Sequence, residues 1–444
     1  MNVSRMIKYL ESQTRPSLNY LGIAILIAAV AIMLNTPRSM SPVWYGPYLS
    51  AAENLNWGGR FLVNLDEVKA FREMSDEQRY EYRFSARSDL QEYIANPLGY
   101  AYFIFAAKKI FFWLPDVRAI EAFQILLHTM LSVLVIALLE GWRRKILFLF
   151  LYALNPLVLY YVTFPYYYFL QAIPSFGLIF LLLTRDRWNQ RESNLLQVVL
   201  LIFCAVLAFV LLARSTTIAA VVAFFVLAAL WLPDRRVILL GFAIFSILYS
   251  TGYSSSQKNF WHTAYIGVGA YPNTHMQGLS DDNGYTLFEE KSGSPLNASL
   301  GGNYYEEPVM AKYKEIAQAE YLRILRSDWP SLMRNALLNS LQGFTIGYLV
   351  GKPYWVHIFM AAAGFVFLFL LLATRQFMLV TLTLLTVLPF TLYFPPIPAY
   401  MYGAYLLLVA GALCALQKTG LLGIRQPPQK PQTHVPVPQS GHKT

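Results

Sequence analysis

Apolar stretches long enough to cross a bilayer recur along most of the chain. A membrane-spanning helix needs about 20 consecutive, mainly apolar residues. Such stretches lie near residues 19–35, 119–140, 146–163, 167–184, 195–213, 216–233, 236–252, 355–373, 377–394 and 398–416. The pattern predicts an all-α polytopic membrane protein with about ten transmembrane helices.

Two further apolar runs, near residues 97–114 and 333–350, are ambiguous. Lys108 and Lys109 lie in the first run, and lysines at mid-bilayer depth are costly. If both runs crossed the membrane, most of the central Lys and Arg clusters would lie outside the cytoplasm, against the positive-inside rule. We expect both runs to form helices that lie in, or dip into, the outer leaflet.

The distribution of basic residues predicts the orientation of the chain. With Arg5, Lys8 and Arg15 inside, ten spans leave the other basic clusters on the cytoplasmic side as well. These clusters contain Arg143, Arg144, Lys145, Arg185, Arg187, Arg191, Arg235, Arg236, Arg375, Lys418, Arg425 and Lys430. We therefore expect a multi-pass protein of a bacterial inner or plasma membrane, with both termini in the cytoplasm.

Two long polar segments would then be extracytoplasmic: residues 35–116 (loop one) and residues 251–337 (loop two). Connections between helices typically have about 4–6 residues, so segments of this size indicate a function of their own. We expect the two loops to fold together into one vestibule on a compact helical base. This arrangement is typical of an enzyme that works at the membrane surface.

The loops contain local patterns of their own. Mixed charge and helix formers predict surface helices over residues 45–56 and 67–93, and Gly, Asn and Asp predict turns over 267–293. Residues 310–324 are expected to form an amphipathic helix. Its apolar face would carry Tyr313, Ile316, Ala317 and Tyr321.

Composition agrees with a membrane protein. The chain of 444 residues is 56% hydrophobic and only 14% charged, whereas soluble domains have about 25% charged residues. Cytoplasmic Lys and Arg account for most of the net charge of +10, so no nucleic-acid partner is indicated. Residues 1–425 are expected to form one integral-membrane domain. Residues 426–444, rich in Pro and Gln, are expected to be a disordered cytoplasmic tail.

The loops contain carboxylates that could act as a general base. The candidates in loop one are Asp66, Glu67 and Glu53, and loop two has the pair Asp281 and Asp282. A single exposed carboxylate is most often a solvated surface group. The two adjacent pairs stand out because each lies beside aromatic or apolar residues. A sugar transfer would need a carboxylate that takes the proton of the acceptor.

Cations on the outer face are the second kind of candidate, because the charge rule disfavours them there. Arg214 follows the fifth apolar stretch and Arg118 begins the second. Guanidinium groups suit bidentate hydrogen bonding to a lipid phosphate. The alternative is that each side chain reaches out to lipid headgroups. Lys258 and His262, at the start of loop two, could reach the same zone.

Aromatic residues at the start of loop two are the third kind of candidate. Trp261 and Tyr265 flank His262 and could cover the apolar faces of a sugar, with Asp281 and Asp282 binding its hydroxyls. Aromatic residues are also common at every membrane interface. The six histidines are scattered and no Cys pair or HExxH sequence occurs, so no cofactor or metal site is indicated, although a divalent metal stays open.

The layout resembles the C-type glycosyltransferases, membrane enzymes that use polyprenyl-phosphate-linked sugars. This group includes protein mannosyltransferases, lipid A aminoarabinose transferases and oligosaccharyltransferase catalytic subunits. The resemblance covers nearly the whole chain in layout. Its local features are an NPLGY sequence with an apolar helix (Asn96 to Leu114), Val117-Arg118-Ala119 before the next span, and WHTAYIGVGAYPN (Trp261 to Asn273). These short motifs have low specificity.

The resemblance implies transfer of a sugar to a glycan, lipid or protein acceptor on the extracytoplasmic face, with inversion. One difference from the family is clear, because Ser41 to Leu55 has no acidic residue before Tyr48, where family members usually carry one. Asp66, Glu67 and Glu53 are our substitutes. The alternatives are an O-antigen polymerase or ligase, which would need more loop arginines, and a glycan flippase, which would need more polar residues inside the spans.

Overall fold

The computed structural model describes residues 3–34, 42–93, 98–188, 193–253, 259–298 and 302–419. The predicted tail at 426–444, Asn96 and Lys258 lie outside these ranges. The described part of the chain is helical apart from one short antiparallel ladder, in which β1 (Leu62–Val63) pairs with β2 (Gln91–Glu92). The predicted all-α class is therefore confirmed.

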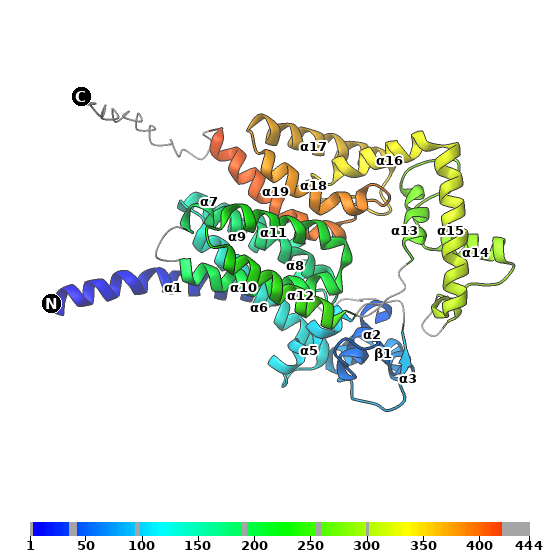
Figure 1. Cartoon of the computed structure of the whole chain (residues 1–444), viewed down its shortest axis with the longest axis horizontal. Helices are drawn as coiled ribbons and strands as arrows, with labels where there is room; N and C mark the ends of the chain where they lie inside the picture. Colours follow the sequence, from blue (N-terminus) through cyan, green and yellow to red (C-terminus); the bar gives the residue numbers. More distant parts are fainter. Residues whose placement is uncertain are drawn as a thin grey trace, which may run out of the picture.

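A bundle of helices makes up most of the molecule (Figure 1). Short 3-10 or π turns, labelled η, join or extend several of its helices. The elements of the bundle are α1 (Val3–Leu34), α6 (Asp116–Leu138), α7 (Trp142–Phe148), η1 (Leu149–Ala153), α8 (Pro156–Val162), η2 (Tyr167–Gln171), α9 (Ala172–Thr184), η3 (Arg185–Arg187), α10 (Ser193–Ala213), η4 (Ser215–Thr217), α11 (Ile218–Trp231), α12 (Arg235–Gly252), α17 (Tyr354–Ala373), α18 (Phe377–Thr391) and α19 (Pro398–Lys418).

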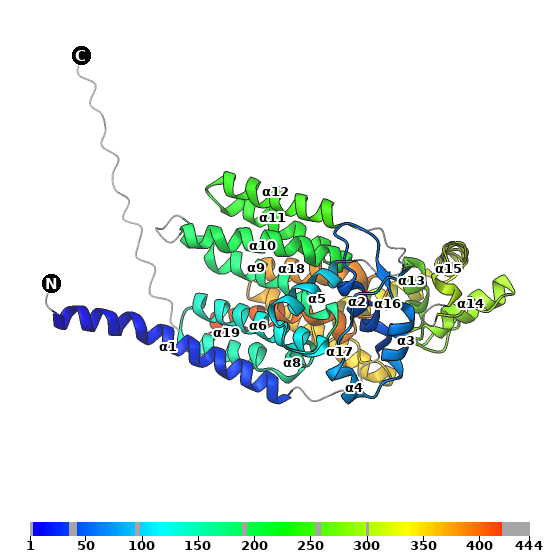
Figure 2. The same cartoon turned by 90° about the horizontal axis from the view of Figure 1, so that it is seen from below.

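The two large loops contribute the remaining elements. Loop one contains α2 (Pro42–Glu53), β1, α3 (Leu65–Glu73), α4 (Asp76–Glu81), β2 and α5 (Gly99–Ile110). Loop two leads through α13 (Phe260–Gly267), η5 (Val268–Ala270), α14 (Asp282–Ser292), η6 (Asn303–Tyr305) and α15 (Glu307–Ser327) to α16 (Trp329–Gln342). Both loops lie at one end of the bundle, and the start of α1 and the end of α19 lie at the other (Figures 1 and 2).

The chain is a multi-pass membrane protein. Within the described residues, six helices are long and apolar enough to cross a membrane, and a seventh span is possible if the bent pair Trp142–Ala153 and Pro156–Val162 counts as one. The six begin at Asp116, Tyr167, Asn194, Arg235, Tyr354 and Pro398. All coincide with predicted spans. Three shorter apolar helices lie at other predicted spans, so the total of about ten remains a prediction.

The two ambiguous runs contain short helices. Helix α5 has 12 residues and α16 has 14 residues, which at about 1.5 Å per residue is well short of a hydrocarbon core of about 30 Å. Neither is among the candidate spans found in the described chain. Their predicted position in the outer leaflet stays a prediction.

Buried polar side chains on α6 bind carbonyl groups near both ends of α8. The segment Trp142–Ala153 and α8 are bent by 56° at the break between them, and α8 ends at Val162. Carbonyl groups at both places lack helical donors. Gln124 donates to the carbonyls of Val162 (3.1 Å) and Phe164 (2.8 Å), and His128 Nε2 lies 3.0 Å from the Ala153 carbonyl. Because no water competes inside a bilayer, such carbonyls need a protein donor.

Two predictions about the loops were wrong in part. Helix α2 forms where a surface helix was predicted, but it is buried, with Tyr48 and Leu49 fully enclosed between α3, α5 and the bundle. The predicted turns over 267–293 give way to α14 from Asp282 onward. The amphipathic helix is confirmed as α15, in which Tyr313 and Ala317 are fully buried.

Candidate active site

Arg214 lies where α10 ends, at the end of the bundle that carries both loops. Its Nε donates to the Thr216 hydroxyl (3.1 Å), and one terminal nitrogen donates to the Tyr167 hydroxyl (3.0 Å). The guanidinium carbon is also 4.5 Å from the centre of the Tyr400 ring and 5.0 Å from that of Tyr167. Arg214 is therefore partly buried between aromatic faces and hydroxyl groups.

No carboxylate compensates the charge of Arg214. Among the described residues, every ion pair involves a different cation. A partly desolvated charge that is held only by neutral groups is unfavourable and attracts a counter-ion. A phosphate oxygen would supply that counter-charge, and a guanidinium can bind two such oxygens at once.

Tyrosines from several parts of the chain surround Arg214. We call Tyr48, Tyr166, Tyr167, Tyr168 and Tyr400 the tyrosine cluster. Ring centres are 6.3 Å apart for Tyr48 and Tyr167 and 6.2 Å apart for Tyr168 and Tyr400. Burial raises the pKa of the Tyr48 phenol well above its usual range, so this group stays neutral. Through Tyr48 on α2, loop one is part of the surroundings of Arg214.

Loop two also contributes to the surroundings of Arg214. The Phe260 ring of α13 lies 4.8 Å from that of Tyr393. Tyr393 and Tyr400 both pack against the apolar core of loop two, around Tyr265 and Ile266. Asp281 in turn contacts His262 on α13, the helix that carries Tyr265 and Ile266. The structure therefore connects Arg214 and Asp281, which were predicted separately, through Tyr400 and α13.

A chain of hydrogen bonds links the core of loop two to Asp281. The Tyr313 hydroxyl lies 2.5 Å from His262 Nδ1, and His262 Nε2 lies 3.2 Å from Asp281 Oδ1. The Tyr285 ring stacks on the imidazole with an interplanar angle of 11°. The hydrogen bond from His262 holds the pKa of Asp281 below its usual range, although partial burial opposes this. The Asp281 side chain itself is 67% exposed.

The other predicted aromatic and acidic residues of loop two have different surroundings. Trp261 is partly buried and lies 6.0 Å from the Tyr321 ring. Tyr265 is buried in the core of the loop, where burial raises its pKa. Asp282 is exposed at the start of α14 and accepts a hydrogen bond from Ser280 (3.1 Å). None of these three joins the hydrogen-bonded chain at His262.

The loop-one carboxylates are distributed over three separate positions. Asp66 is 87% exposed, with Lys69 at 3.9 Å. Glu67 is buried and accepts hydrogen bonds from the Tyr82 hydroxyl (3.0 Å) and the Ser85 backbone (3.3 Å), so it holds the segment after α4 in place. The pKa of Tyr82 is raised by burial and by this contact with Glu67.

Glu53 belongs to an ion cluster that explains Lys108. The ammonium group of Lys108 contacts the carboxylate of Glu53 and lies 2.6 Å from Asp116 Oδ2. Asp116 also accepts a hydrogen bond from the Phe84 backbone (2.9 Å). The lysine that argued against a membrane crossing therefore joins α2, α5 and α6 at the end of the bundle.

The other two predicted cations, Arg118 and Lys258, are not among the described contacts of Arg214. Arg118 forms an ion pair with Glu81, and both side chains are about half exposed or more. Lys258 lies outside the described residues, so its predicted role stays a prediction. Within the described chain, no group of three or more His, Cys, Asp or Glu side chains could hold a metal ion.

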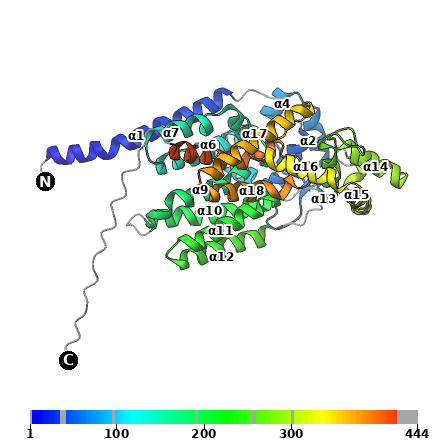
Figure 3. The ribbon, with the colours of Figure 1, turned by 90° about the horizontal axis from the view of Figure 1, so that it is seen from above.

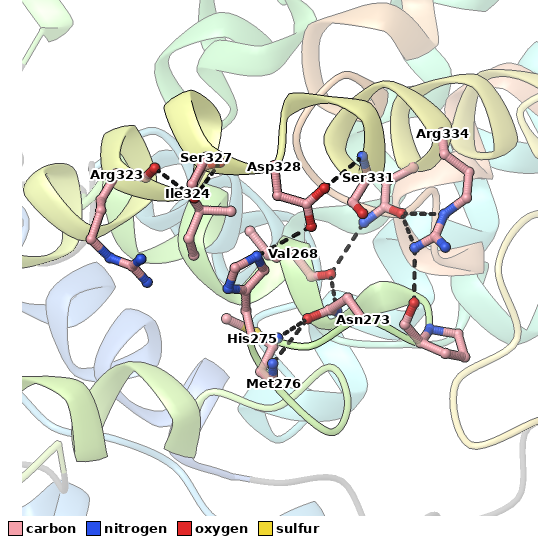
Figure 4. Close-up of polar contacts among 12 residues, drawn as sticks. Val268, Asn273, His275, Met276, Arg323, Ile324, Ser327, Asp328, Ser331 and Arg334 are labelled. Atoms are coloured by element: carbon pink, nitrogen blue, oxygen red, sulfur yellow. Dashed lines mark hydrogen bonds and ion pairs between the residues drawn. The ribbon is translucent and has the colours of Figure 1, made fainter.

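A second polar network, not predicted from the sequence, supports loop two (Figure 4). His275 Nε2 lies 3.2 Å from Asp328, which also caps the start of α16. A hydrogen bond from Ser331 contributes most to a lowered pKa of Asp328. Asn273 accepts from the backbone of His275 and Met276 and donates to the Val268 carbonyl. These bonds fix the segment after α13 against the corner of α15 and α16.

Sequence reasoning missed the residues that complete the site. Tyr167 and Tyr400 hold Arg214, and Tyr313 holds His262. The run of three tyrosines at residues 166–168, directly before α9, was the available signal for the first of them. Nothing near Tyr400 in the sequence indicates its partner.

No protein-family model matches the chain, and no match to a curated protein was found. Among solved structures, the chain is similar to the archaeal oligosaccharyltransferase AglB from Archaeoglobus fulgidus in complex with an inhibitory peptide and a dolichol-phosphate. The similarity covers 91% of this chain, with 14% identity and a TM-score of 0.41. The chain spans 51% of that protein's length. A similarity at this level does not decide a substrate.

Proposed function

We propose that the chain is an integral-membrane glycosyltransferase that takes a sugar from a polyprenyl-phosphate donor. The observation that carries this proposal is Arg214, a partly buried cation with neutral partners only. It lies at the end of a membrane bundle, where a lipid phosphate would lie. The donor's polyprenyl chain would run along the apolar bundle while its phosphate binds the guanidinium.

The reaction would be a single displacement at the sugar. The acceptor hydroxyl oxygen forms a bond to the anomeric carbon as the bond from that carbon to the phosphate oxygen breaks. The electron pair stays on the leaving lipid phosphate, whose charge Arg214 stabilises with hydrogen bonds. A carboxylate takes the acceptor proton, and the anomeric configuration is inverted.

The distribution of cations supports an extracytoplasmic active site. The basic residues at the start of α7, in η3 and at the start of α12 lie at the end opposite the loops (Figures 1 and 3). The start of α1 is also there. Because Lys and Arg are retained on the cytoplasmic side, that end is proposed to face the cytoplasm. The acceptor would be a glycan, a lipid or a protein, reached from the other side.

The test compares two arginines in a binding assay. Purified protein in nanodiscs is titrated with polyprenyl monophosphate, and the dissociation constant is measured for the native chain, Arg214→Ala and Arg118→Ala. Loss of a charge-assisted hydrogen bond costs roughly 1.5–3 kcal/mol, so Arg214→Ala is expected to bind about 10- to 100-fold more weakly. Arg118 is already paired with Glu81, and its variant should bind within about twofold of the native protein.

Equal affinity of the native chain and Arg214→Ala would reject the phosphate site. Arg214→Lys refines the result. Lysine keeps the charge but lacks the planar fork of donors, so this variant should recover only part of the affinity. Full recovery would mean that charge alone is recognised.

A glycan flippase is the second candidate, favoured by the buried polar residues Gln124 and His128 in a membrane helix. Both side chains, however, already hydrogen-bond to backbone carbonyls near the two ends of α8, which gives them a structural role. A vesicle assay that follows movement of a labelled lipid-linked sugar between leaflets separates the two functions. Sugar transfer without movement supports the transferase.

The contacts of the arginines in loop two give less support to a polymerase or ligase of lipid-linked glycans. Arg323 forms an ion pair with Glu320 (2.6 Å), and Arg334 donates to the Pro272 carbonyl (2.9 Å). These two cations of loop two are therefore already engaged, whereas a diphosphate would need several available cations.

A further inference from the structure

Neutral histidine has one N–H group, and the contacts of His262 decide where it lies. An ionised carboxylate can only accept hydrogen bonds, so Nε2 must donate to Asp281. Nδ1 is then an acceptor, and the Tyr313 hydroxyl donates to it. For a neutral imidazole, the direction of both bonds follows from the two groups that His262 contacts. The chain Tyr313–His262–Asp281 is a directed relay that ends on a carboxylate.

The exposure of the side chains increases along the relay, from Tyr313 to Asp281. Tyr313 is fully buried and His262 has a side chain that is 13% exposed, whereas that of Asp281 is 67% exposed. One oxygen of Asp281 takes the histidine bond. In the described residues, no side chain or backbone group donates to the other oxygen. The relay thus holds a carboxylate in a set orientation and leaves one of its oxygens open to a ligand.

Close packing of α14 maintains this geometry. A Cβ atom on Gly284 would lie 2.2 Å from the Tyr313 hydroxyl oxygen and 2.6 Å from His262 Nδ1. Only a residue without a side chain allows the helix to approach the hydrogen bond so closely. Asp281 is the N-cap of the same helix. The turn that accommodates the relay therefore also places its terminal carboxylate.

The open carboxylate belongs to the part of loop two that packs beside the proposed phosphate site. Asp281 bonds to His262 on α13, Tyr265 and Ile266 of the same helix share an apolar cluster with Tyr400, and the Tyr400 ring lies 4.5 Å from the Arg214 guanidinium. The loop-one carboxylates are less suitable, because Glu53 is bound to Lys108 and Glu67 is buried among donors. Asp66 is exposed but has only Lys69 near it.

We propose that Asp281 is the general base of the sugar transfer and that His262 and Tyr313 are positioning residues for it. This inference rests on the proposed function. The acceptor hydroxyl gives its proton to the free oxygen of Asp281 while its own oxygen attacks the anomeric carbon. The lipid phosphate leaves with the electron pair, and the proton later passes from Asp281 to solvent. The relay replaces the loop-one acid that the C-type resemblance leads one to expect.

The experiment uses two probes so that the base and the phosphate site are tested separately. Polyprenyl monophosphate measures binding at Arg214. Polyprenyl-phosphate mannose, glucose and arabinose measure turnover, through release of polyprenyl phosphate in the presence of native membrane extract as the acceptor source. The variants are Asp281→Asn and its control Asp66→Asn, both isosteric and both at exposed side chains.

General base catalysis is worth about 10²–10⁴-fold, so Asp281→Asn should lower kcat by about 100-fold or more. Its affinity for polyprenyl monophosphate should stay within about twofold of native, because the phosphate site is intact. Asp66→Asn should leave both values unchanged. Native turnover in Asp281→Asn, or loss of turnover in Asp66→Asn alone, would overturn the assignment. Weak phosphate binding by native protein would instead count against the proposed function.

A second pair of variants tests the relay rather than the base. Gln at position 262 can still donate from its amide to Asp281, whereas Ala cannot. His262→Gln should retain kcat about 10-fold higher than His262→Ala. Nitrogen NMR of histidine-labelled protein should report the Nε2–H tautomer for His262. An Nδ1–H tautomer, or equal kcat for the two variants, would remove His262 and Tyr313 from the proposal.

Discussion

Gly99, the first residue of α5, lies against the main chain of Ala213, the residue before Arg214. A Cβ atom on Gly99 would be 2.1 Å from the Ala213 nitrogen and 2.3 Å from the Leu212 carbonyl carbon. The two helices meet at backbone contact distance, and this contact supports the position of Arg214. It also provides a physical reason for the glycine in the NPLGY sequence, where the motif had suggested only a resemblance.

The first prediction concerns this contact. Gly99→Ala forces a methyl group into backbone atoms that cannot rotate away, and overpacking of this kind costs about 1–3 kcal/mol. We expect a lower thermal unfolding temperature in detergent and weaker binding of polyprenyl monophosphate. Gly22→Ala is the control, because a Cβ there has no neighbour within 4 Å. If Gly99→Ala is as stable as the control, the contact does not support the site.

The second prediction concerns the ion cluster at Lys108. Lys108→Met leaves the buried Asp116 and the partly buried Glu53 without a counter-charge, and breaking a buried pair typically costs about 3–5 kcal/mol. Lys109 is exposed and has no carboxylate partner among the described residues, so Lys109→Met should be nearly neutral. Thermal unfolding measures both. Adding Asp116→Asn should recover part of the stability lost in Lys108→Met, and no recovery would contradict the pairing.

The third prediction concerns the carbonyl groups at the end of α8, which Gln124 binds. Gln124→Leu removes the donor to two carbonyls, and a buried group left without its partner costs about 1–3 kcal/mol. We expect a loss of about 2 kcal/mol or more in the free energy of unfolding. Gln197→Leu, at a partly exposed position of α10, is the comparison. A Gln124→Leu protein as stable as Gln197→Leu would remove the structural interpretation of this residue.

The fourth prediction is a pH dependence. The hydrogen bond from His262 lowers the pKa of Asp281, so the base stays ionised to a lower pH than the usual value of about 3.9. His262→Phe removes that donor, and the pKa should rise. The acid limb of the kcat profile is therefore expected to move to higher pH in the variant.

The other titratable groups around Asp281 are Tyr313, Tyr400 and the adjacent, exposed Asp282. All three are present in both proteins, so a difference between the two profiles reports the loss of His262. The position of the midpoint, rather than the height of the profile, is the measurement. A midpoint that is unchanged or lower in His262→Phe would show that the histidine does not act on this carboxylate.

The residues of the site differ in how far the sequence alone could identify them. Arg214 could be selected from the sequence, because a cation at the outer end of an apolar stretch is rare for reasons of charge alone. His262 and Asp281 could be selected as polar groups in a large loop, but their bond could not, because residues 19 positions apart meet only after α14 packs on α13. The general-base role predicted for Glu67 and Glu53 requires an available carboxylate, and both side chains are engaged by partners within loop one.

By itself, the sequence determined the class of the protein, the position of its apolar helices and the existence of two large loops. Hydrophobicity over about 20 residues is a local property of the sequence, and it determines directly whether a helix can cross a bilayer. Only the tertiary structure decided that α2 is buried, that Tyr400 covers Arg214, and that Asp281 rather than Asp66 has an oriented carboxylate. Burial and hydrogen bonding in a loop depend on contacts between distant segments, which no local pattern encodes.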